Sequence, residues 1–129
     1  MDRPTIKPIQ WVASAREDLR AFPPMVRNVM GTALYFAQTG GKHPRAKPLK
    51  GVVQGAGVLE IVDDHDGDTF RTVYTVRFPD AVYVLHAFQK KSRRGRTTPK
   101  HEIELIRARY EWAKSDYEDG RDTKKRRKP

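Results

Sequence analysis

The stretch TFRTVYTVRFPDAVYVLHAFQK (residues 69–90) decides the fold of this chain, because it contains two strands joined by a tight turn at Pro79–Asp80. Alternation of apolar and polar residues predicts a half-buried strand over residues 69–78. One face of that strand is expected to carry Phe70, Thr72, Tyr74, Val76 and Phe78. In the next strand, residues 81–90, a common face is expected for Val82, Val84, His86, Phe88 and Lys90.

A third strand is predicted before this pair at VLEIV (residues 58–62), and the acidic segment DDHDGD (residues 63–68) separates the two. An Asp-Gly pair in this segment favours a tight hairpin turn. A calcium loop starting at Asp64 is excluded, because its sixth position is Thr69 instead of Gly and its twelfth is Thr75 instead of Glu. We therefore predict a three-stranded antiparallel meander.

Upstream of the meander, the sequence predicts a short edge strand and two helices. Residues 5–12 (TIKPIQWV) contain a proline, which an edge strand tolerates. The segment SARE (residues 14–17) has the capping-box pattern that opens a short helix. A second helix follows from Pro24 to the stop at Gly40–Gly41. The short connection predicts an antiparallel helix hairpin, and the Pro- and Gly-rich residues 42–57 are predicted to form a loop.

Downstream of the meander, Thr98 and Pro99 are expected to be the N-cap and first residue of a helix that ends near Glu118. Its apolar stripe consists of Ile103, Ile106, Tyr110, Ala113 and Tyr117. The expected fold is α+β, a small antiparallel sheet with an N-terminal helix hairpin and a C-terminal helix, all on one face of the sheet. Residues 1–119 form this domain, and residues 120–129 a basic disordered tail.

Positive charge dominates the composition. The chain of 129 residues has 26 Lys and Arg against 16 Asp and Glu, a net charge of +10 and a pI near 10.1. Residues 90–100 and residues 120–129 each contain six basic residues, and the two segments together contain a single acidic residue. These segments carry the net positive charge, and the rest of the chain is nearly neutral. Two basic segments of this kind favour nucleic acid as a partner.

The composition also excludes several classes of protein. The absence of cysteine excludes a disulfide framework and any thiolate metal site or nucleophile. Apolar runs such as AVYVL (residues 81–85) are far too short to span a membrane, and the N-terminal residues lack the apolar run of a signal peptide. A soluble cytoplasmic domain without a membrane partner is therefore expected.

Five segments together resemble the RelE/ParE toxin superfamily, and in particular its phage-type HigB branch. They are AKPLKG (46–51), GVLEI (57–61), DGDTFRTVY (66–74), VYVLHAFQKKS (82–92) and TPKHEI (98–103). The resemblance implies a RelE-like fold and the toxin of a type II toxin–antitoxin pair, neutralised by a cognate helix-turn-helix antitoxin. Most RelE and HigB relatives are endoribonucleases that cut mRNA on the ribosome, whereas ParE relatives poison DNA gyrase.

Two features depart from the pattern of this superfamily. Many RelE relatives carry an arginine two residues after the strand glutamate, and here the residue two after Glu60 is Val62. Several relatives also use a His or Tyr at the extreme C-terminus as a catalytic group. This chain has only Lys- and Arg-rich sequence there, so the group that transfers the proton is open.

RNA cleavage without a metal ion or other cofactor needs attack by the 2′-hydroxyl, positive charge on the phosphorane and a proton donor for the leaving oxygen. Arg71 is the predicted phosphate clamp, because its guanidinium can form a bidentate contact from a rigid strand. Lys90 and Lys91 are the other predicted catalytic residues, since crowding by cations favours a neutral, basic lysine. His86 is a candidate for proton transfer. RNA or phosphate contacts are predicted for Lys47, Lys50, Phe88, Arg93, Arg94 and Arg96.

Each assignment has a structural alternative. Arg71 can form an ion pair with Glu60 across the strands, and His86 can be a packed core residue. The basic residues 90–100 can be a solvated loop, and His101 can be exposed without a function. The rival function is a non-enzymatic toxin or nucleic-acid binder, either ParE-like or a degenerate toxin that binds RNA. Strand register decides whether Arg71 and Lys90 face the same side. Burial of Arg71 beneath helices, or a direction away from the basic turn 90–94, would overturn cleavage by these residues and leave only a cationic nucleic-acid binder.

Overall fold

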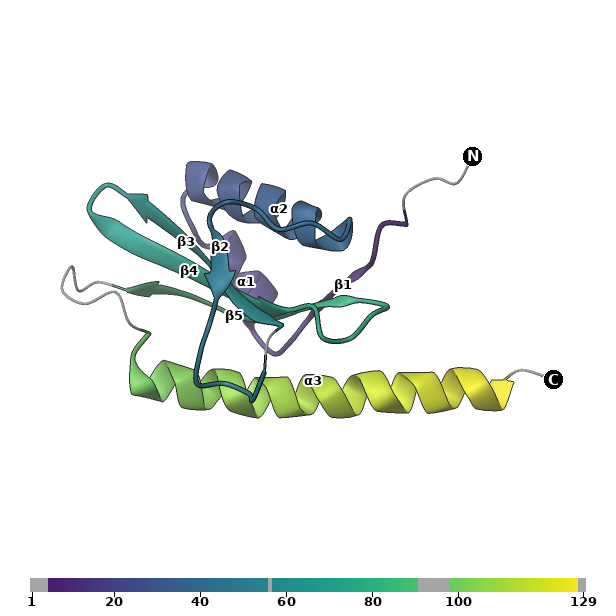
Figure 1. Ribbon diagram of the computed structural model, residues 1–129. Coiled ribbons are helices and arrows are strands. Elements are labelled where there is room, and N and C mark those ends of the chain that lie inside the picture. Colours follow the sequence, from purple (N-terminus) through teal and green to yellow (C-terminus); the bar gives the residue numbers. More distant parts are fainter. Residues whose placement is uncertain (1–4, 56, 91–97, 128–129) are drawn as a thin grey trace.

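The computed structural model describes residues 5–55, 57–90 and 98–127, with side chains as far as residue 120 (Figure 1). The elements, in chain order, are β1 (Ile9–Trp11), α1 (Ala15–Arg20), α2 (Pro24–Gln38), β2 (Ala46–Pro48), β3 (Val58–His65), β4 (Asp68–Thr75), β5 (Val82–Lys90) and α3 (Lys100–Arg127). No helix in these ranges is long and apolar enough to cross a bilayer. The predicted α+β fold, with two N-terminal helices, a sheet and a C-terminal helix, is confirmed.

The sheet has five strands in the order β1-β5-β4-β3-β2. Its centre is the predicted antiparallel meander of β3, β4 and β5. The Asp-Gly hairpin is also confirmed, because β3 and β4 are joined only by Asp66 and Gly67, at φ 50° and 85°. The predicted edge strand is β1, which pairs parallel to β5. The opposite edge is β2, which lies inside the predicted loop 42–57 and pairs antiparallel to β3.

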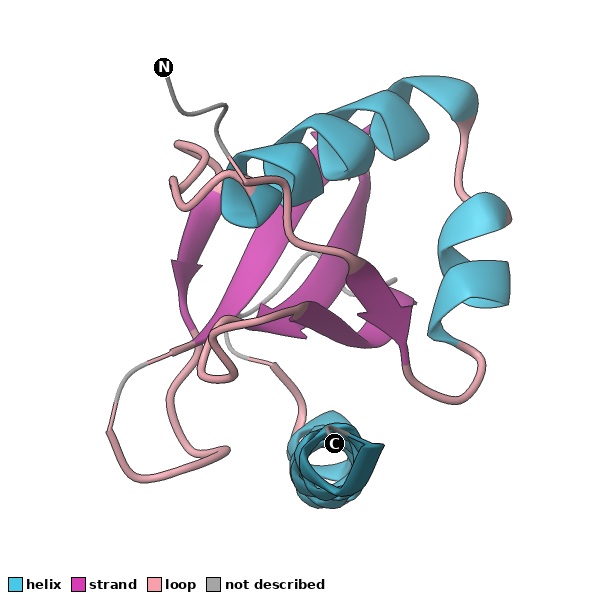
Figure 2. Ribbon diagram, turned by 90° about the vertical axis from the view of Figure 1, so that its right-hand side faces the viewer, coloured by secondary structure: helices cyan, strands magenta, loops and turns pink. Residues whose placement is uncertain are grey.

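Helices cover both faces of the sheet, and the expectation that they cover a single face is wrong. Figure 2 shows α1 and α2 on one side of the sheet and α3, seen end-on, on the other. The physical reason is that the central strands are apolar on both faces, so each face must be buried. Phe70 and Tyr74 pack in the cluster with α1 and α2, whereas Val73 and Leu85 pack with Ile106 of α3.

A β-bulge in β5 changes which side chains share a face. Val73 pairs with His86 while Tyr74 pairs with Val84, so Leu85 is an extra residue in β5. Val82 and Val84 therefore pack with α1 and α2, whereas Phe88 packs against the cluster under α3 and His86 bonds to α3. The predicted common face of residues 82–90 is wrong beyond Val84. Phe78, three residues past the end of β4, also lies on the α3 side.

The helix ends differ in part from the predicted caps. Ser14 precedes α1 as predicted, but its hydroxyl donates to the Asp18 carboxylate at 2.8 Å instead of capping a backbone N–H. Thr98 precedes α3, but its hydroxyl donates to Glu60 at 2.9 Å. The α3 helix continues to Arg127, past the predicted end at Glu118, so its backbone shows no boundary at residue 120.

Candidate active site

The strand register brings several predicted site residues to the face of the sheet that α3 covers. Arg71 of β4 lies opposite Phe88 of β5, and Lys90 is two residues further along the same strand. Because side chains alternate along a strand, Arg71, Phe88 and Lys90 point to one side. Glu60 of β3 pairs with Lys47 of β2 and contacts Arg71, so this face continues to the β2 edge.

Arg71 is buried, with an exposed fraction of 3%. Its Nη1 donates hydrogen bonds of 3.0 Å to both carboxylate oxygens of Glu60 and one of 3.2 Å to the hydroxyl of Thr98. The ion pair between Arg71 and Glu60 is thus present, as the structural alternative expected. The buried guanidinium of Arg71 is therefore not the exposed clamp for phosphate that the sequence had suggested.

A cavity of about 350 Å³ opens next to this ion pair. Its lining residues are Lys47, Pro48, Leu49, Lys50, Glu60, Thr98 and Ile103. Glu60 is 3% exposed but is one of the residues that line the cavity, and its carboxylate accepts hydrogen bonds from Arg71 and Thr98. The ammonium of Lys47 is 3.8 Å from the same carboxylate, and its side chain is half exposed. The cavity therefore combines one fixed carboxylate with two lysines.

This arrangement can perform two chemical tasks. A carboxylate held by two donors is oriented to accept a proton from a hydroxyl group in the cavity. The ammonium groups of Lys47 and Lys50 can bind a phosphate and stabilise negative charge that develops on it. Glu60 and Thr98 were not predicted as site residues. The feature that could have identified Glu60 is its pairing with Lys47 across β2 and β3. This pairing was not predictable, because β2 lies in a Pro- and Gly-rich segment that was predicted to be a loop.

His86 is not one of the residues that line this cavity. It is 7% exposed, stacks on Phe88 with ring centroids 4.9 Å apart, and bonds through Nε2 to the Glu102 carboxylate. Arg109 Nη1 donates to His86 Nδ1 at 3.2 Å, which places the ring proton on Nε2 in the neutral form. Burial lowers the pKa of His86. These contacts fit the packed core histidine better than a proton-transfer group.

The remaining predicted residues are only partly described. Lys90 ends β5 and is partly exposed, and Phe88 is half-buried. His101 is exposed, with Nε2 3.2 Å from the Glu102 carboxylate. The predicted catalytic Lys91 and the predicted RNA contacts Arg93, Arg94 and Arg96 lie outside the described residues.

Comparisons with known proteins define the class. A family model described as "Phage derived protein Gp49-like" matches residues 17–111. The match covers well over half of the 129 residues of the chain. The chain therefore belongs to the family of phage-derived Gp49-like proteins, which confirms the predicted phage-type relationship.

The solved structures provide one further comparison. A chain from the crystal structure of the toxin–antitoxin complex RelBE2 from Mycobacterium tuberculosis aligns with 18% identity and a TM-score of 0.44. The alignment covers 71% of this chain and 100% of that one. A likeness at this level supports no argument about function. Among curated proteins, none matches this sequence.

Proposed function

We propose that this protein is the toxin of a type II toxin–antitoxin system, a ribosome-dependent endoribonuclease that cleaves mRNA by metal-free attack of the 2′-hydroxyl on the adjacent phosphorus. The observation that carries the proposal is Glu60, which lines a cavity together with Lys47 and Lys50 and whose carboxylate is held by Arg71 and Thr98. A base and two cations in one cavity are the groups that this reaction needs.

Each group has a role in the proposed reaction. Glu60 accepts the proton of the 2′-hydroxyl, and the 2′-oxygen then forms a bond to phosphorus. The ammonium groups of Lys47 and Lys50 bind the phosphorane oxygens, and one of them gives a proton to the 5′-oxygen as the bond from phosphorus to that oxygen breaks. The products are a 2′,3′-cyclic phosphate and a free 5′-hydroxyl.

Arg71 has an indirect role in this scheme. Because its guanidinium is buried and donates to both oxygens of Glu60, it fixes the orientation of the carboxylate. It is thus a positioning residue. Lys90 lies on the same face, and we propose that it adds positive charge there.

A second candidate function follows from the burial of Arg71. If cleavage needs a guanidinium in contact with the scissile phosphate, this structure supplies none at that position, and the protein is a non-enzymatic toxin that binds RNA through its cations. A gyrase-poisoning relative is the other non-enzymatic form. Such a gyrase poison would inhibit supercoiling and leave mRNA intact, whereas an RNA binder would show steeply salt-dependent affinity without products.

We propose a cytoplasmic location, with mRNA on the ribosome and a cognate helix-turn-helix antitoxin as partners. Induction of the protein in bacteria, followed by primer extension on a translated message, tests the proposed activity. We expect growth arrest and new 5′ ends at codon boundaries, both suppressed by the antitoxin. Growth arrest with intact messages would instead support the non-enzymatic candidates.

A further inference from the structure

The part of the chain that surrounds α2 has an unusual distribution of charge. Residues 19–59 contain no Asp or Glu but include six basic residues, namely Arg20, Arg27, Lys42, Arg45, Lys47 and Lys50. Charge is therefore unevenly distributed in the part of the chain outside the two basic segments. Its positively charged stretch includes the whole of α2 and β2. Such a segment attracts a polyanion.

The exposed side of α2 has a bare position at its centre. Gly31 is exposed, and a Cβ added there would meet nothing within 4 Å. Glycine in the middle of a helix costs about 1 kcal/mol relative to alanine. Neither packing nor a positive φ requires glycine at this position. Its remaining use is to let another molecule approach the helix backbone closely.

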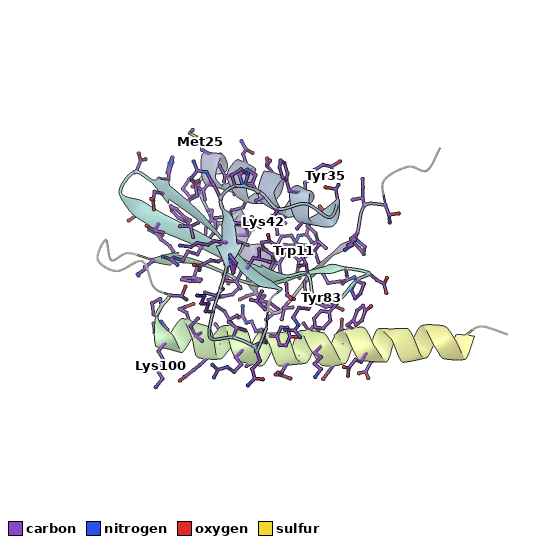
Figure 3. All side chains as sticks on the ribbon, in the orientation of Figure 1. Trp11, Met25, Tyr35, Lys42, Tyr83 and Lys100 are labelled. Atoms are coloured by element: carbon purple, nitrogen blue, oxygen red, sulfur yellow. The ribbon has the colours of Figure 1, made fainter. Side chains whose placement is uncertain are left out.

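Arg27 and Tyr35 lie on the same ridge of α2 as Gly31, because each is four residues away. Both side chains are exposed, Tyr35 by 51%. In Figure 3, Tyr35 and Met25 project from α2 away from the sheet. A cation and an aromatic ring therefore flank a bare stretch of helix, which suits a phosphate on one side and a stacked base on the other.

The surface continues from the end of α2 toward β2. Phe36, 40% exposed, makes an edge contact with His43, with ring centroids 5.1 Å apart. Lys42 is exposed beside them, and Arg45 is half exposed although it forms a 2.8 Å ion pair with Asp63. Two residues further, Lys47 lines the candidate active site. The chain therefore leads from the end of α2, through Lys42 and Arg45, to the cavity-lining Lys47 at the β2 edge.

We propose that this α2 surface, formed by Arg27, Gly31, Tyr35, Phe36, Lys42 and His43, binds a single strand of RNA that continues past the β2 edge into the cavity. The proposal rests on the proposed function, because it extends the RNA site of that function. RNA fits this surface better than a protein helix, since the cations Arg27 and Lys42 lie on it together with the exposed rings of Tyr35 and Phe36.

Binding of a fluorescent 2′-O-methyl RNA oligonucleotide to the full chain tests the proposal without cleavage, because this RNA has no 2′-hydroxyl to attack. Gly31→Glu and Gly31→Gln add bulk with and without charge, and both should retain the helix. We expect Gly31→Glu and Tyr35→Ala each to weaken binding on the order of tenfold. Arg27→Ala should lower the slope of log affinity against log salt by ~0.7.

Ser115→Glu, an equal change of charge on exposed helix α3, is the matched control and should alter affinity less than twofold. Equal effects of Gly31→Glu and Ser115→Glu would overturn the proposal. So would loss of antitoxin binding in Gly31→Glu with unchanged RNA affinity, because the surface would then belong to a protein partner. A cleavage assay with the wild-type protein separates the proposed RNA-binding surface from the proposed nuclease activity. If the α2 variants weaken RNA binding but the wild type cleaves no RNA, the nuclease proposal is wrong and the binding surface stands.

Discussion

Arg71 donates two hydrogen bonds of 3.0 Å to the carboxylate of Glu60, and both residues are 3% exposed. The two charges are removed from water together on adjacent central strands. Thr98 closes the arrangement by accepting from Arg71 and donating to Glu60. Through these bonds Thr98 connects the start of α3 to the Arg71–Glu60 ion pair. The same contacts stabilise the domain and orient the carboxylate of Glu60, the proposed base.

Removal of one partner should leave a buried, uncompensated charge. We expect Arg71→Ala to lower the free energy of unfolding by about 3–5 kcal/mol, as measured by urea denaturation. The control Arg16→Ala, on an exposed position of α1, should change it by about 0.5 kcal/mol or less. An Arg71→Ala variant as stable as wild type would show that the ion pair does not stabilise the fold.

Thr98 should contribute through its two hydrogen bonds. Thr98→Val keeps the shape of the side chain but leaves groups of Arg71 and Glu60 without their hydroxyl partner, so we expect a loss of about 1–3 kcal/mol. Thr69→Val removes an exposed hydroxyl bond to Asp64 and should cost less than about 0.5 kcal/mol. Equal losses in thermal or urea unfolding would contradict the role of Thr98.

Stability should fall in mild acid because of His86. Burial lowers the pKa of His86 below its ordinary value of 6.5, and the charge of Arg109 lowers it further, while Glu102 and Asp18 oppose this shift. The unfolded chain therefore binds the proton more readily than the folded one. Stability from the neutral ring is complete above pH 6.5 and is lost as the pH falls through the folded pKa.

Urea denaturation between pH 7.5 and pH 5 checks this expectation. His86→Gln should flatten the dependence of unfolding free energy on pH, because it removes the titrating group. His101→Gln alters an exposed histidine and should retain the wild-type profile. A profile that does not change in His86→Gln would assign the acid sensitivity to other groups.

Gly31 should limit the stability of α2. Gly31→Ala is expected to raise the free energy of unfolding by about 0.5–1 kcal/mol, since alanine restricts the unfolded chain and meets no neighbour in the helix. Gly120→Ala near the end of α3, where an added Cβ also meets nothing, provides a comparison at a helix end. A destabilised Gly31→Ala variant would mean that the glycine has a structural reason.

The sequence predicted those parts of the fold that depend on local signals. The Asp66–Gly67 pair predicted the hairpin, and the apolar stripe containing Ile106 and Tyr110 predicted the buried side of α3. The bulge at Leu85 has no local signal, because it depends on packing between β4 and β5. It reversed the expected faces of His86 and Phe88.

The candidate site was predictable only in part for the same reason. Lys47, Lys50 and Arg71 were identified from their basic character, but their relative placement depends on β2 and on strand register. The cavity depends on the pairing of Glu60 with Lys47 and on its contact with Arg71, neither of which has a local sequence signal. Burial of Arg71 likewise depends on Glu60 and Thr98, residues that lie far from it in sequence.

Cleavage of a translated message by purified toxin and ribosomes, comparing wild type with the double variant Lys47→Ala/Lys50→Ala, tests the central claim most directly. Both lysines are exposed, so the variant should stay folded, and we expect its cleavage rate to fall at least about 100-fold. The double variant Lys7→Ala/Lys114→Ala, with the same change of charge elsewhere, should cleave like wild type. Equal cleavage by both double variants, or no cleavage by the wild-type toxin, would contradict the account.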